Sequence, residues 1–293
     1  MNQLLDRDYL KTFLRNSGLR PKDYLGQNFL VDEVALKNII LAADIKSSDT
    51  ILEVGPGLGV LTEELAKRAG KVIAVEKDPK LVRILQATST KLTIVTFVEG
   101  DILKFRPEEH ITGPYKVVAN IPYYLTSKLF QFFLEPVSTR NDSGQSSRGG
   151  KNNPPESLVL MVQKEVGERV VAAPGELSIL GISVQVYADA EIKAYVPKTS
   201  FWPVPEVDSV ILKITPRDKY PEIKDKKLFF RIVKIAFAGK RKQIHNTLGN
   251  GLHLDKEKTN ELLTQAGIDG AMRPQDLKIE QWIELYKSIN VGL

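Results

Sequence analysis

The strongest constraint on the fold is a regular alternation of residue patterns that begins at residue 50. Short runs of strand-forming residues alternate there with helical patterns, in the order TILEVG (50–55), VLTEELAKRAG (60–70), KVIAVE (71–76) and DPKLVRILQA (78–87). This alternation is typical of βαβ units, in which helices cover the faces of a parallel sheet. The pattern therefore predicts an α/β fold.

The chain after residue 90 predicts the remaining strands. Apolar runs of strand length occur at residues 93–100, 115–120, 157–163, 191–197 and 207–216. The last two runs are joined only by residues 198–206, and such a short connection favours antiparallel pairing. We therefore expect the sheet to end in an antiparallel edge. A helix is predicted just before this pair, at residues 177–190.

The C-terminal part is predicted to be helical from Tyr220 onward, most clearly at residues 227–248 and 279–289. A hinge is expected at residues 215–222, which gives two domains, 1–215 and 216–293. Residues 138–155 are almost free of apolar side chains and are rich in Ser, Gly, Asn and Pro. Such a segment cannot offset the entropy cost of ordering, so a flexible insertion is expected there.

Composition narrows the classes of function. The 293 residues, 42% of them hydrophobic, suffice to bury a core without disulfides. With no cysteine and only three histidines, we expect neither a zinc-thiolate site nor metal catalysis. No apolar run is long enough to cross a bilayer, and the N-terminal residues lack a signal-peptide core, so a soluble, cytoplasmic monomer is expected. A net charge of +5 permits a polyanionic partner, but a mildly basic surface without a partner fits the charge equally well.

A glycine-rich turn follows the strand predicted at residues 50–55. Gly55, Gly57 and Gly59 lie where this strand leads into a helix, and glycine lets a ligand approach the backbone closely there. The spacing is G-x-G-x-G, unlike the G-x-G-x-x-G of dinucleotide binding, and the acidic Glu53 precedes it. A carboxylate at this position disfavours a pyrophosphate and suits a cationic ligand. The turn predicts a cofactor site, with NAD disfavoured.

Two further carboxylates stand at predicted strand ends. Glu76 ends the second strand, where a carboxylate can accept hydrogen bonds from both hydroxyls of a ribose. Asp101 follows the third strand, where it can hold an adenine amino group. Because the carboxyl ends of parallel strands meet at one edge of a sheet, these residues should converge on one crevice. S-adenosylmethionine, an adenosine that bears a positive sulfonium, fits all of these positions.

The fourth strand ends in the motif NIPYY. The amide oxygen of Asn120 and the carbonyl of Ile121 can accept the two N–H groups of an adenine amine, which localises its lone pair for attack on a methyl group. Pro122 fixes the backbone that carries these acceptors. Tyr123 offers a face on which the base can stack. Such a mechanism depends on proximity and orientation and needs no strong general base.

At this point the chain resembles the ribosomal RNA adenine dimethyltransferases. The matching blocks are PKDYLGQNFL, EVGPGLGVLTEEL, VEKD, EGDIL, NIPYYLTS, LSILGISVQVYAD, FWPVPEVDSVILKI and KRKQIHNTL, in this order. The resemblance implies a Rossmann-like, seven-stranded methyltransferase domain with a small all-helical C-terminal domain. It also implies transfer of two methyl groups to N6 of each of two adjacent adenosines, in the 3′-terminal hairpin of small-subunit rRNA within an assembling 30S particle.

The resemblance assigns roles to individual residues. It places cofactor contacts on Asn28, Leu30, Gly55, Gly57, Glu76, Asp101, Ile102 and Asn120. It places Phe201 near the target base, beside Asn120, Ile121, Pro122 and Tyr123. The positions expected to contact RNA phosphates are Arg20, Lys22, Lys240, Arg241 and Lys242. Lys240, Arg241 and Lys242 are also compatible with a solvated helix face.

Four other functions remain open at the level of sequence. An NAD-dependent oxidoreductase is disfavoured by the glycine spacing and by the absence of a plausible proton donor near the predicted site. The large-subunit rRNA adenine methyltransferases share the chemistry, although PKDYLGQNFL and the C-terminal blocks favour the small subunit. A DNA adenine methyltransferase would more often have two prolines after its Asp or Asn, whereas Ile121 separates Asn120 from Pro122 here. A noncatalytic assembly or transcription factor on the same fold is disfavoured by the intact Glu76, Asp101 and Asn120.

Overall fold

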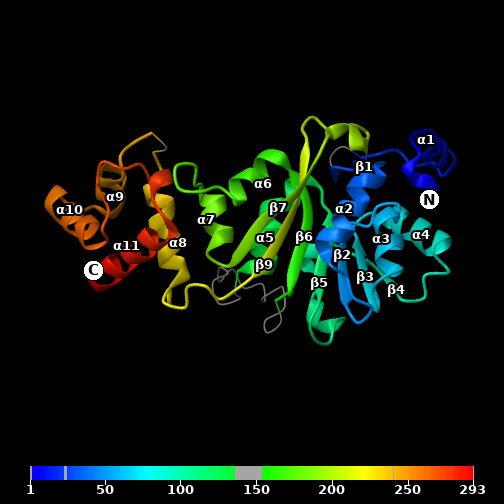
Figure 1. The fold of residues 1–293 in the computed structure, drawn as a ribbon, viewed down its shortest axis with the longest axis horizontal. Coiled ribbons are helices and arrows are strands. Elements are labelled where there is room, and N and C mark those ends of the chain that lie inside the picture. The colour runs from blue at the N-terminus through cyan, green and yellow to red at the C-terminus, as the bar shows by residue number, and fades with distance from the viewer. Residues whose placement is uncertain (1, 23–24, 136–153, 240, 293) are drawn as a thin grey trace. The chain divides into compact units, whose positions relative to one another are not determined.

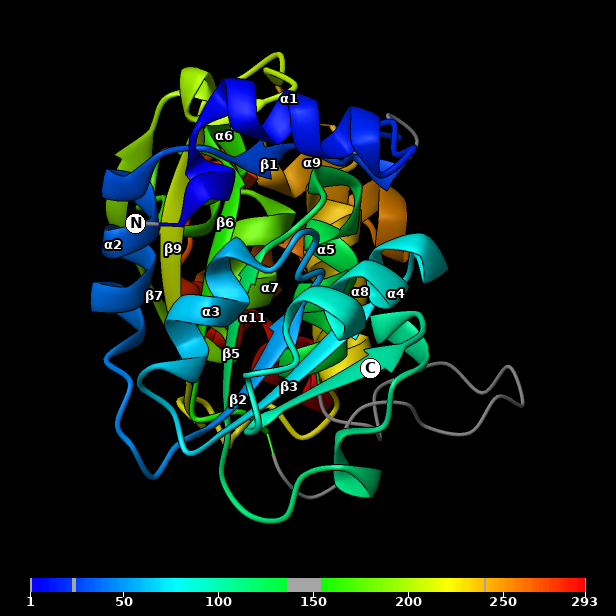
Figure 2. The same cartoon turned by 90° about the vertical axis from the view of Figure 1, so that its right-hand side faces the viewer.

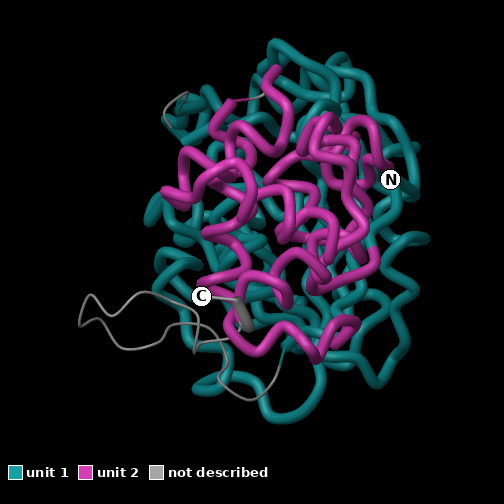
Figure 3. Tube along the Cα trace, turned by 90° about the vertical axis from the view of Figure 1, so that its left-hand side faces the viewer, with its two compact units in different colours: residues 1–167, 190–216 teal, residues 168–189, 217–293 magenta. Residues whose placement is uncertain are grey.

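The computed structural model describes residues 2–22, 25–135, 154–239 and 241–292. They form two compact units, which are coloured separately in Figure 3. Unit 1 comprises residues 1–167 and 190–216, and unit 2 comprises residues 168–189 and 217–293. The segment 168–189 therefore groups with the C-terminal residues. The division at residue 215 into a methyltransferase domain and an rRNA-binding domain stays a prediction. Most of the predicted insertion at 138–155 lies outside the described residues.

A mixed, seven-stranded sheet forms the centre of unit 1 in the described part of the chain (Figure 1). The strand order is β4-β3-β2-β5-β6-β9-β7. Neighbouring strands from β4 to β6 run parallel, whereas β9 runs antiparallel to β6. The predicted α/β sheet with an antiparallel strand beyond its parallel part is confirmed. The strands are β2 (Thr50–Val54), β3 (Lys71–Glu76), β4 (Val95–Glu99), β5 (Lys116–Asn120), β6 (Ser157–Gln163), β7 (Ala188–Val196) and β9 (Ser209–Pro216).

Helices bury both faces of this sheet, which explains why its central strands are almost continuously apolar. The neighbouring residues Ile51 and Leu52 point to opposite faces, and both are fully buried. The chain runs from β2 toward β4 in one direction and from β5 to β6 in the other, so right-handed crossovers place their helices on opposite faces. Figure 2 shows α2 and α3 on one side and α5 on the other. These helices and their neighbours are α2 (Glu33–Ala43), α3 (Val60–Ala66), α4 (Pro79–Thr88), α5 (Thr126–Leu134) and α6 (Lys164–Val170).

The N-terminal helix α1 (Arg7–Asn16) covers the glycine-rich turn. Its buried Leu10 and Leu14 belong to one apolar cluster with Phe29, Leu58 and Leu81. This cluster joins the N-terminal segment to the region after β2, which contains Leu58, and to α4 after β3, which contains Leu81. The N-terminal segment is thereby held against the carboxyl edge of the sheet.

A two-stranded antiparallel ribbon, β1 (Phe29–Leu30) with β8 (Phe201–Trp202), was not predicted. The segment 198–206 was expected to be a loop throughout, and its two strand residues correct that expectation. A hydrogen bond of 2.6 Å from the Ser200 hydroxyl to Asp32 Oδ2 supports the ribbon. Strands of two residues leave no periodic pattern in the sequence, which explains why only the structure reveals this pairing.

The helix predicted at residues 177–190 is also corrected. Helix α7 spans only Ile179–Gln185, and β7 already begins at Ala188. From there buried or half-buried residues alternate with exposed ones, which is the period of a strand with one solvated face. The alternating pattern that identified the later part of this strand therefore begins three residues earlier than predicted.

The helices of unit 2 pack around Phe229 and Trp282, both fully buried. They are α7, α8 (Lys226–Ala236), α9 (Ile244–Leu252), α10 (Lys256–Gln265) and α11 (Ile279–Gly292). The predicted helical C-terminal region is confirmed, although the segment 227–248 forms two helices because α8 ends at Ala236. Short 3-10 turns complete the described chain: Gln3–Leu5, Ile102–Lys104, Pro107–Glu109, η5 (Tyr123–Leu125), Lys198–Ser200 and Pro274–Asp276. Within the described ranges, no helix combines the length and apolarity that a membrane span requires.

Candidate functional site

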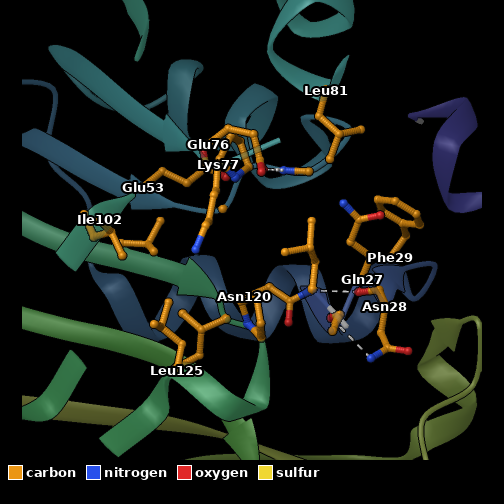
Figure 4. A pocket seen from close by; sticks show the side chains of 18 of the residues that line it. Gln27, Asn28, Phe29, Glu53, Glu76, Lys77, Leu81, Ile102, Asn120 and Leu125 are labelled. Carbon is orange, nitrogen blue, oxygen red and sulfur yellow. Dashed lines mark hydrogen bonds between the residues drawn. The ribbon is translucent and has the colours of Figure 1, made fainter. Parts of the chain in front are cut away.

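The carboxyl edge of the sheet opens into a cavity where the strand order reverses. β2 and β5 are neighbours, and the chain leaves them in opposite directions, so the loops that follow them diverge. The cavity between these loops encloses about 1160 Å³ when the open solvent at its mouth is included. Figure 4 shows side chains from the strand ends and from the N-terminal segment around this space.

The structure brings the predicted cofactor and base residues together in this one cavity. Those that line it are Asn28, Leu30, Gly55, Gly57, Glu76, Asp101, Ile102, Asn120, Ile121, Pro122, Tyr123 and Phe201. They lie between 28 and 201 in the sequence, and all belong to unit 1. Their functional roles stay predictions, but their common location is a finding.

The glycine-rich turn adopts a backbone conformation that other residues rarely reach. Gly55, Gly57 and Gly59 all have φ values between 61° and 87°. A Cβ atom on Gly59 would lie 2.9 Å from Leu85 Cδ2, so a side chain there would also require Leu85 to shift. The amide of Gly57 donates a 3.1 Å hydrogen bond to Glu76 Oε2. The turn thus positions the first carboxylate of the site.

Glu76 is a buried carboxylate held by backbone donors. Besides the Gly57 amide, the amide of Asp78 donates to its Oε1 at 2.9 Å. Burial raises the pKa of Glu76, and these hydrogen bonds oppose that effect. Each oxygen therefore accepts one of these two hydrogen bonds, and the Lys77 amide contributes a smaller effect. The carboxylate retains capacity to accept further donors, as a pair of ribose hydroxyls would require.

Asp101 is held at the rim by Lys77, a residue that the sequence analysis did not select. The Lys77 ammonium lies 3.0 Å from Asp101 Oδ2, and the Leu103 amide donates to Oδ1 at 3.0 Å. Although burial alone would raise the pKa of Asp101, these hydrogen bonds and the Lys77 charge lower it. Asp101 therefore stays ionised and can accept an amino group. Because Lys77 follows Glu76 directly in sequence, its place at a strand end was the available signal.

Glu53 presents an unpartnered carboxyl to the same cavity. Glu53 is 1% exposed, and within the described part of the chain neither of its carboxyl oxygens makes a hydrogen bond of normal geometry. Burial raises the pKa of Glu53 to about 8, and the charge of Glu76 raises it further. The nearby Thr62 hydroxyl lowers this pKa, but among the described residues it too makes no hydrogen bond of normal geometry. A buried carboxyl without a partner is costly, and a cationic ligand would relieve that cost. An acidic residue inside an apolar strand was its signal in the sequence.

Asn120 faces the N-terminal segment across the cavity. Its Nδ2 donates to the carbonyl oxygen of Asn28 at 3.4 Å, as drawn in Figure 4. Among the described residues, no donor reaches its Oδ1. Pro122 lies two residues beyond the strand end at Asn120 and packs on Gly26, where a Cβ would lie 3.1 Å from Pro122 Cβ. The amide of Asn120 is thus oriented by one contact and keeps its acceptor available.

The aromatic side chains of the cavity differ sharply in exposure. Phe201 is 1% exposed and packs into the core beneath the sheet edge. Tyr123 is partly buried, and its hydroxyl is hydrogen-bonded to Ser209 Oγ at 2.8 Å. Tyr124, which had no predicted role, lines the cavity with half of its surface exposed.

The basic residues predicted to contact RNA fall into different environments. Arg20 is exposed, whereas the Lys22 ammonium is paired at 2.6 Å with the buried Asp78. Arg241 and Lys242 are exposed in unit 2, and Lys240 lies outside the described residues. Lys22 therefore has a structural contact, which the other described members of this set do not show.

Clusters of metal-binding side chains were also sought. Among the residues whose positions are described, no group of three or more His, Asp or Glu side chains is arranged to hold a metal ion.

Comparisons with known proteins agree along nearly the whole chain. A family model described as ribosomal RNA adenine dimethylase matches residues 18–291. The chain is 42% identical to the ribosomal RNA small subunit methyltransferase A of Dehalococcoides mccartyi, over 94% of this chain and 90% of that protein. It is 39% identical to the protein of the same name from Moorella thermoacetica, over 94% and 95%.

Solved structures show the same fold. A dimethyladenosine transferase from Plasmodium falciparum superposes with a TM-score of 0.72 at 25% identity, over 90% of this chain and 98% of that one. The 23S rRNA methyltransferase ErmE superposes with a TM-score of 0.69 at 26% identity, over 90% and 100%. The predicted Rossmann-like methyltransferase fold with a helical C-terminal region is therefore confirmed.

Proposed function

Because the chain belongs to the ribosomal RNA adenine dimethylase family, we propose that it dimethylates N6 of two adjacent adenosines in the 3′-terminal hairpin loop of small-subunit (16S) rRNA. The chain is an S-adenosylmethionine-dependent rRNA adenine dimethyltransferase, and the adenosine positions are the proposed part. We further propose that one copy acts on rRNA in an assembling 30S particle, in the cytoplasm, late in small-subunit biogenesis and without a metal.

The observation that carries the choice of subunit is the high identity to small subunit methyltransferases over full length. At 42% identity the match covers more than nine tenths of this chain and includes the C-terminal helices. The solved 23S rRNA methyltransferase and the solved dimethyladenosine transferase match about equally, at 26% and 25%, so the sequence relatives alone carry this choice. The small subunit is therefore the better-supported source of the substrate.

The cavity supplies what the cofactor requires. S-adenosylmethionine provides the methyl group on a positively charged sulfonium. Glu76 would accept the ribose hydroxyls with the oxygen capacity left by its two backbone donors, and Asp101 would accept the adenine amino group beside Ile102. The positive charge suits the unpartnered carboxyl of Glu53. Asn28 and Leu30 enclose the cavity from the N-terminal segment, which β8 and α1 hold in place.

The strand end at Asn120 supplies what the target amine requires. Asn120 Oδ1 and the carbonyl of Ile121 would accept the two N–H groups of the adenine amine, which concentrates its lone pair on nitrogen. Pro122, packed against Gly26, fixes these acceptors before the base arrives. Tyr123, fixed at its hydroxyl by Ser209, would bound the base on one side. After transfer the amine is positively charged and acidic, so water suffices to remove its proton.

Transfer of labelled methyl groups to isolated subunits tests the proposal. Small subunits from cells that lack the modification should gain label in the 3′-terminal rRNA fragment, whereas large subunits should not. Label in large-subunit rRNA would favour the function named for the ErmE structure. Cofactor binding without any transfer would instead favour a noncatalytic assembly factor. Either result would overturn the proposed function.

A further inference from the structure

We propose that Tyr124 is a further substrate-binding residue, whose exposed ring stacks on the base next to the target adenosine. The inference rests on the proposed function, because it assumes an RNA substrate with adjacent adenosines. It goes beyond it by assigning a specific RNA contact to a residue that the cofactor and the target amine leave unused.

The first argument is a comparison of the aromatic rings that line the cavity. Phe201 is 1% exposed and belongs to the core, so it cannot offer a free face without repacking. The ring of Tyr123 is anchored at its hydroxyl by Ser209. Tyr124 is 50% exposed and lines the same cavity. Phe29, the fourth aromatic side chain of the lining, is 9% exposed and belongs to the apolar cluster with Leu10 and Leu14. Of these four rings, therefore, Tyr124 alone combines a place at the cavity with a broadly exposed surface.

The second argument is that the backbone of Tyr124 is fixed. It lies in η5 between Tyr123 and the buried Leu125, and the Thr126 hydroxyl donates to the Tyr123 carbonyl at 3.0 Å. The ring also passes close to the backbone of Gly26, since a Cβ atom added there would lie 3.8 Å from Tyr124 Cδ1. A ring held in this way loses little conformational entropy when it stacks on a base.

The third argument concerns which base the ring would meet. The target base must reach Asn120 and the Ile121 carbonyl at the strand end, and Tyr123 follows these acceptors after Pro122. Tyr124, one residue further along and half exposed, is left to the adjoining nucleotide. When two adjacent adenosines are modified in turn, a neighbouring base lies beside the target in both rounds. Stacking accepts either neighbour because every base has an aromatic face.

Kinetics with small subunits that lack the modification test this assignment. Tyr124→Ala should lower kcat/KM for the particle by about 5- to 150-fold, the range expected for loss of one base stack. Tyr124→Phe should stay within about twofold of wild type, whereas Tyr124→Leu should be nearly as impaired as Tyr124→Ala. All three should bind S-adenosylmethionine within about twofold of wild type. Tyr195→Ala, which removes a ring that is 60% exposed outside the cavity lining, is the matched control and should have no effect.

A fluorescent RNA identifies the stacked position. The RNA is a 3′-terminal hairpin in which one of the two adjacent adenosines is replaced by 2-aminopurine. Of the bases at these two positions, only the remaining adenine has a 6-amino group and can be the target. Wild type should quench the 2-aminopurine emission, and Tyr124→Ala should not. Equal emission with both proteins, rescue by Tyr124→Leu or a large loss of cofactor affinity would overturn the inference. Failure of wild type to methylate small subunits would instead refute the proposed function.

Discussion

Asn120 is the residue on which the proposed chemistry depends most directly. Its Nδ2 is engaged by the Asn28 carbonyl, which leaves Oδ1 available to the amine. Asn120→Ala should lower the rate of methyl transfer by orders of magnitude, because an oriented acceptor is lost in the transition state. Cofactor affinity, measured by calorimetry, should stay within about tenfold of wild type.

The opposite outcome would assign Asn120 a different role. If cofactor affinity falls as much as the rate, Asn120 mainly holds the cofactor and does not orient the amine. Asn28→Ala is the informative companion, because it removes another side chain of the cavity but leaves the Asn28 carbonyl and its contact with Asn120 in place.

Glu53 gives the site a dependence on pH. Burial raises its pKa to about 8, above the ordinary value of 4.5, because the protonated carboxyl is favoured in the folded protein. The contribution of protonated Glu53 to the stability of the fold is therefore complete below pH 4.5 and is lost as the pH rises through 8. The free energy of unfolding of the cofactor-free wild type should therefore fall, relative to Glu53→Gln, between pH 5 and pH 9. Chemical denaturation across this range measures the difference.

Cofactor binding should change in the opposite direction over the same range. An ionised Glu53 attracts a cation, so wild-type affinity for S-adenosylmethionine should increase as the pH rises toward 9. Glu53→Gln should lack that increase. Identical pH profiles for the two proteins would show that the Glu53 charge does not act on the cofactor.

At the scale of elements, the pairing of Lys22 with Asp78 connects the N-terminal segment to the start of α4. Asp78 is buried, caps α4 through the Lys80 amide, and also receives Gln27 Nε2 at 3.2 Å. Lys22→Ala should cost about 1–3 kcal/mol in the free energy of unfolding, because it leaves a buried carboxylate with fewer donors.

Arg20→Ala is the matched control for Lys22→Ala, because Arg20 is exposed two residues away. It should change stability by less than about 0.5 kcal/mol. Burial alone would raise the pKa of Asp78, but Lys22 and the other donors lower it, so the cost of Lys22→Ala should disappear in acid below the ordinary value of 3.8. Equal stability of both variants at neutral pH would refute a structural role for Lys22.

The sequence predicts some elements well because their signals are local. The strand ends at Glu76 and Asn120 follow from short apolar runs, and the start of α4 follows from Asp78 and Pro79. These signals need no knowledge of distant residues. Topology then brings the strand ends to one edge, which is why the candidate site could be assembled before the structure was known.

Other features depend on contacts between distant residues. The pairing of Phe29 with Trp202 joins short segments far apart in the chain. Helix α7 ends at Gln185 because strand β7 begins shortly afterwards, at Ala188. Likewise, the ion pair of Lys77 with Asp101 and the unpartnered state of Glu53 appear only when side chains are placed. Local propensity contains no information on such contacts.

At the scale of the whole molecule, RNA binding should draw on exposed cations of unit 2. Arg241 and Lys242 are both exposed beyond the end of α8. If each contacts a phosphate, the double alanine variant should flatten the slope of log affinity against log salt by about 1.5 to 2. Titration of small subunits at several salt concentrations measures that slope.

A control with unrelated cations keeps this result interpretable. Lys256 and Lys278 are exposed lysines of the same unit. Their double alanine variant should leave the salt slope unchanged while removing the same formal charge. Equal slopes for both double variants would mean that Arg241 and Lys242 make no phosphate contacts of their own.

The central claim is that the cavity acts on two adjacent adenosines of the small subunit. Reverse-transcription stops on 16S rRNA test it most directly, since dimethylation of N6 blocks the pairing edge of adenine. After incubation of unmodified small subunits with the protein and S-adenosylmethionine, stops should appear at two neighbouring positions in the 3′-terminal hairpin, and Asn120→Ala should abolish them. Stops elsewhere, or only in large-subunit rRNA, would contradict the claim.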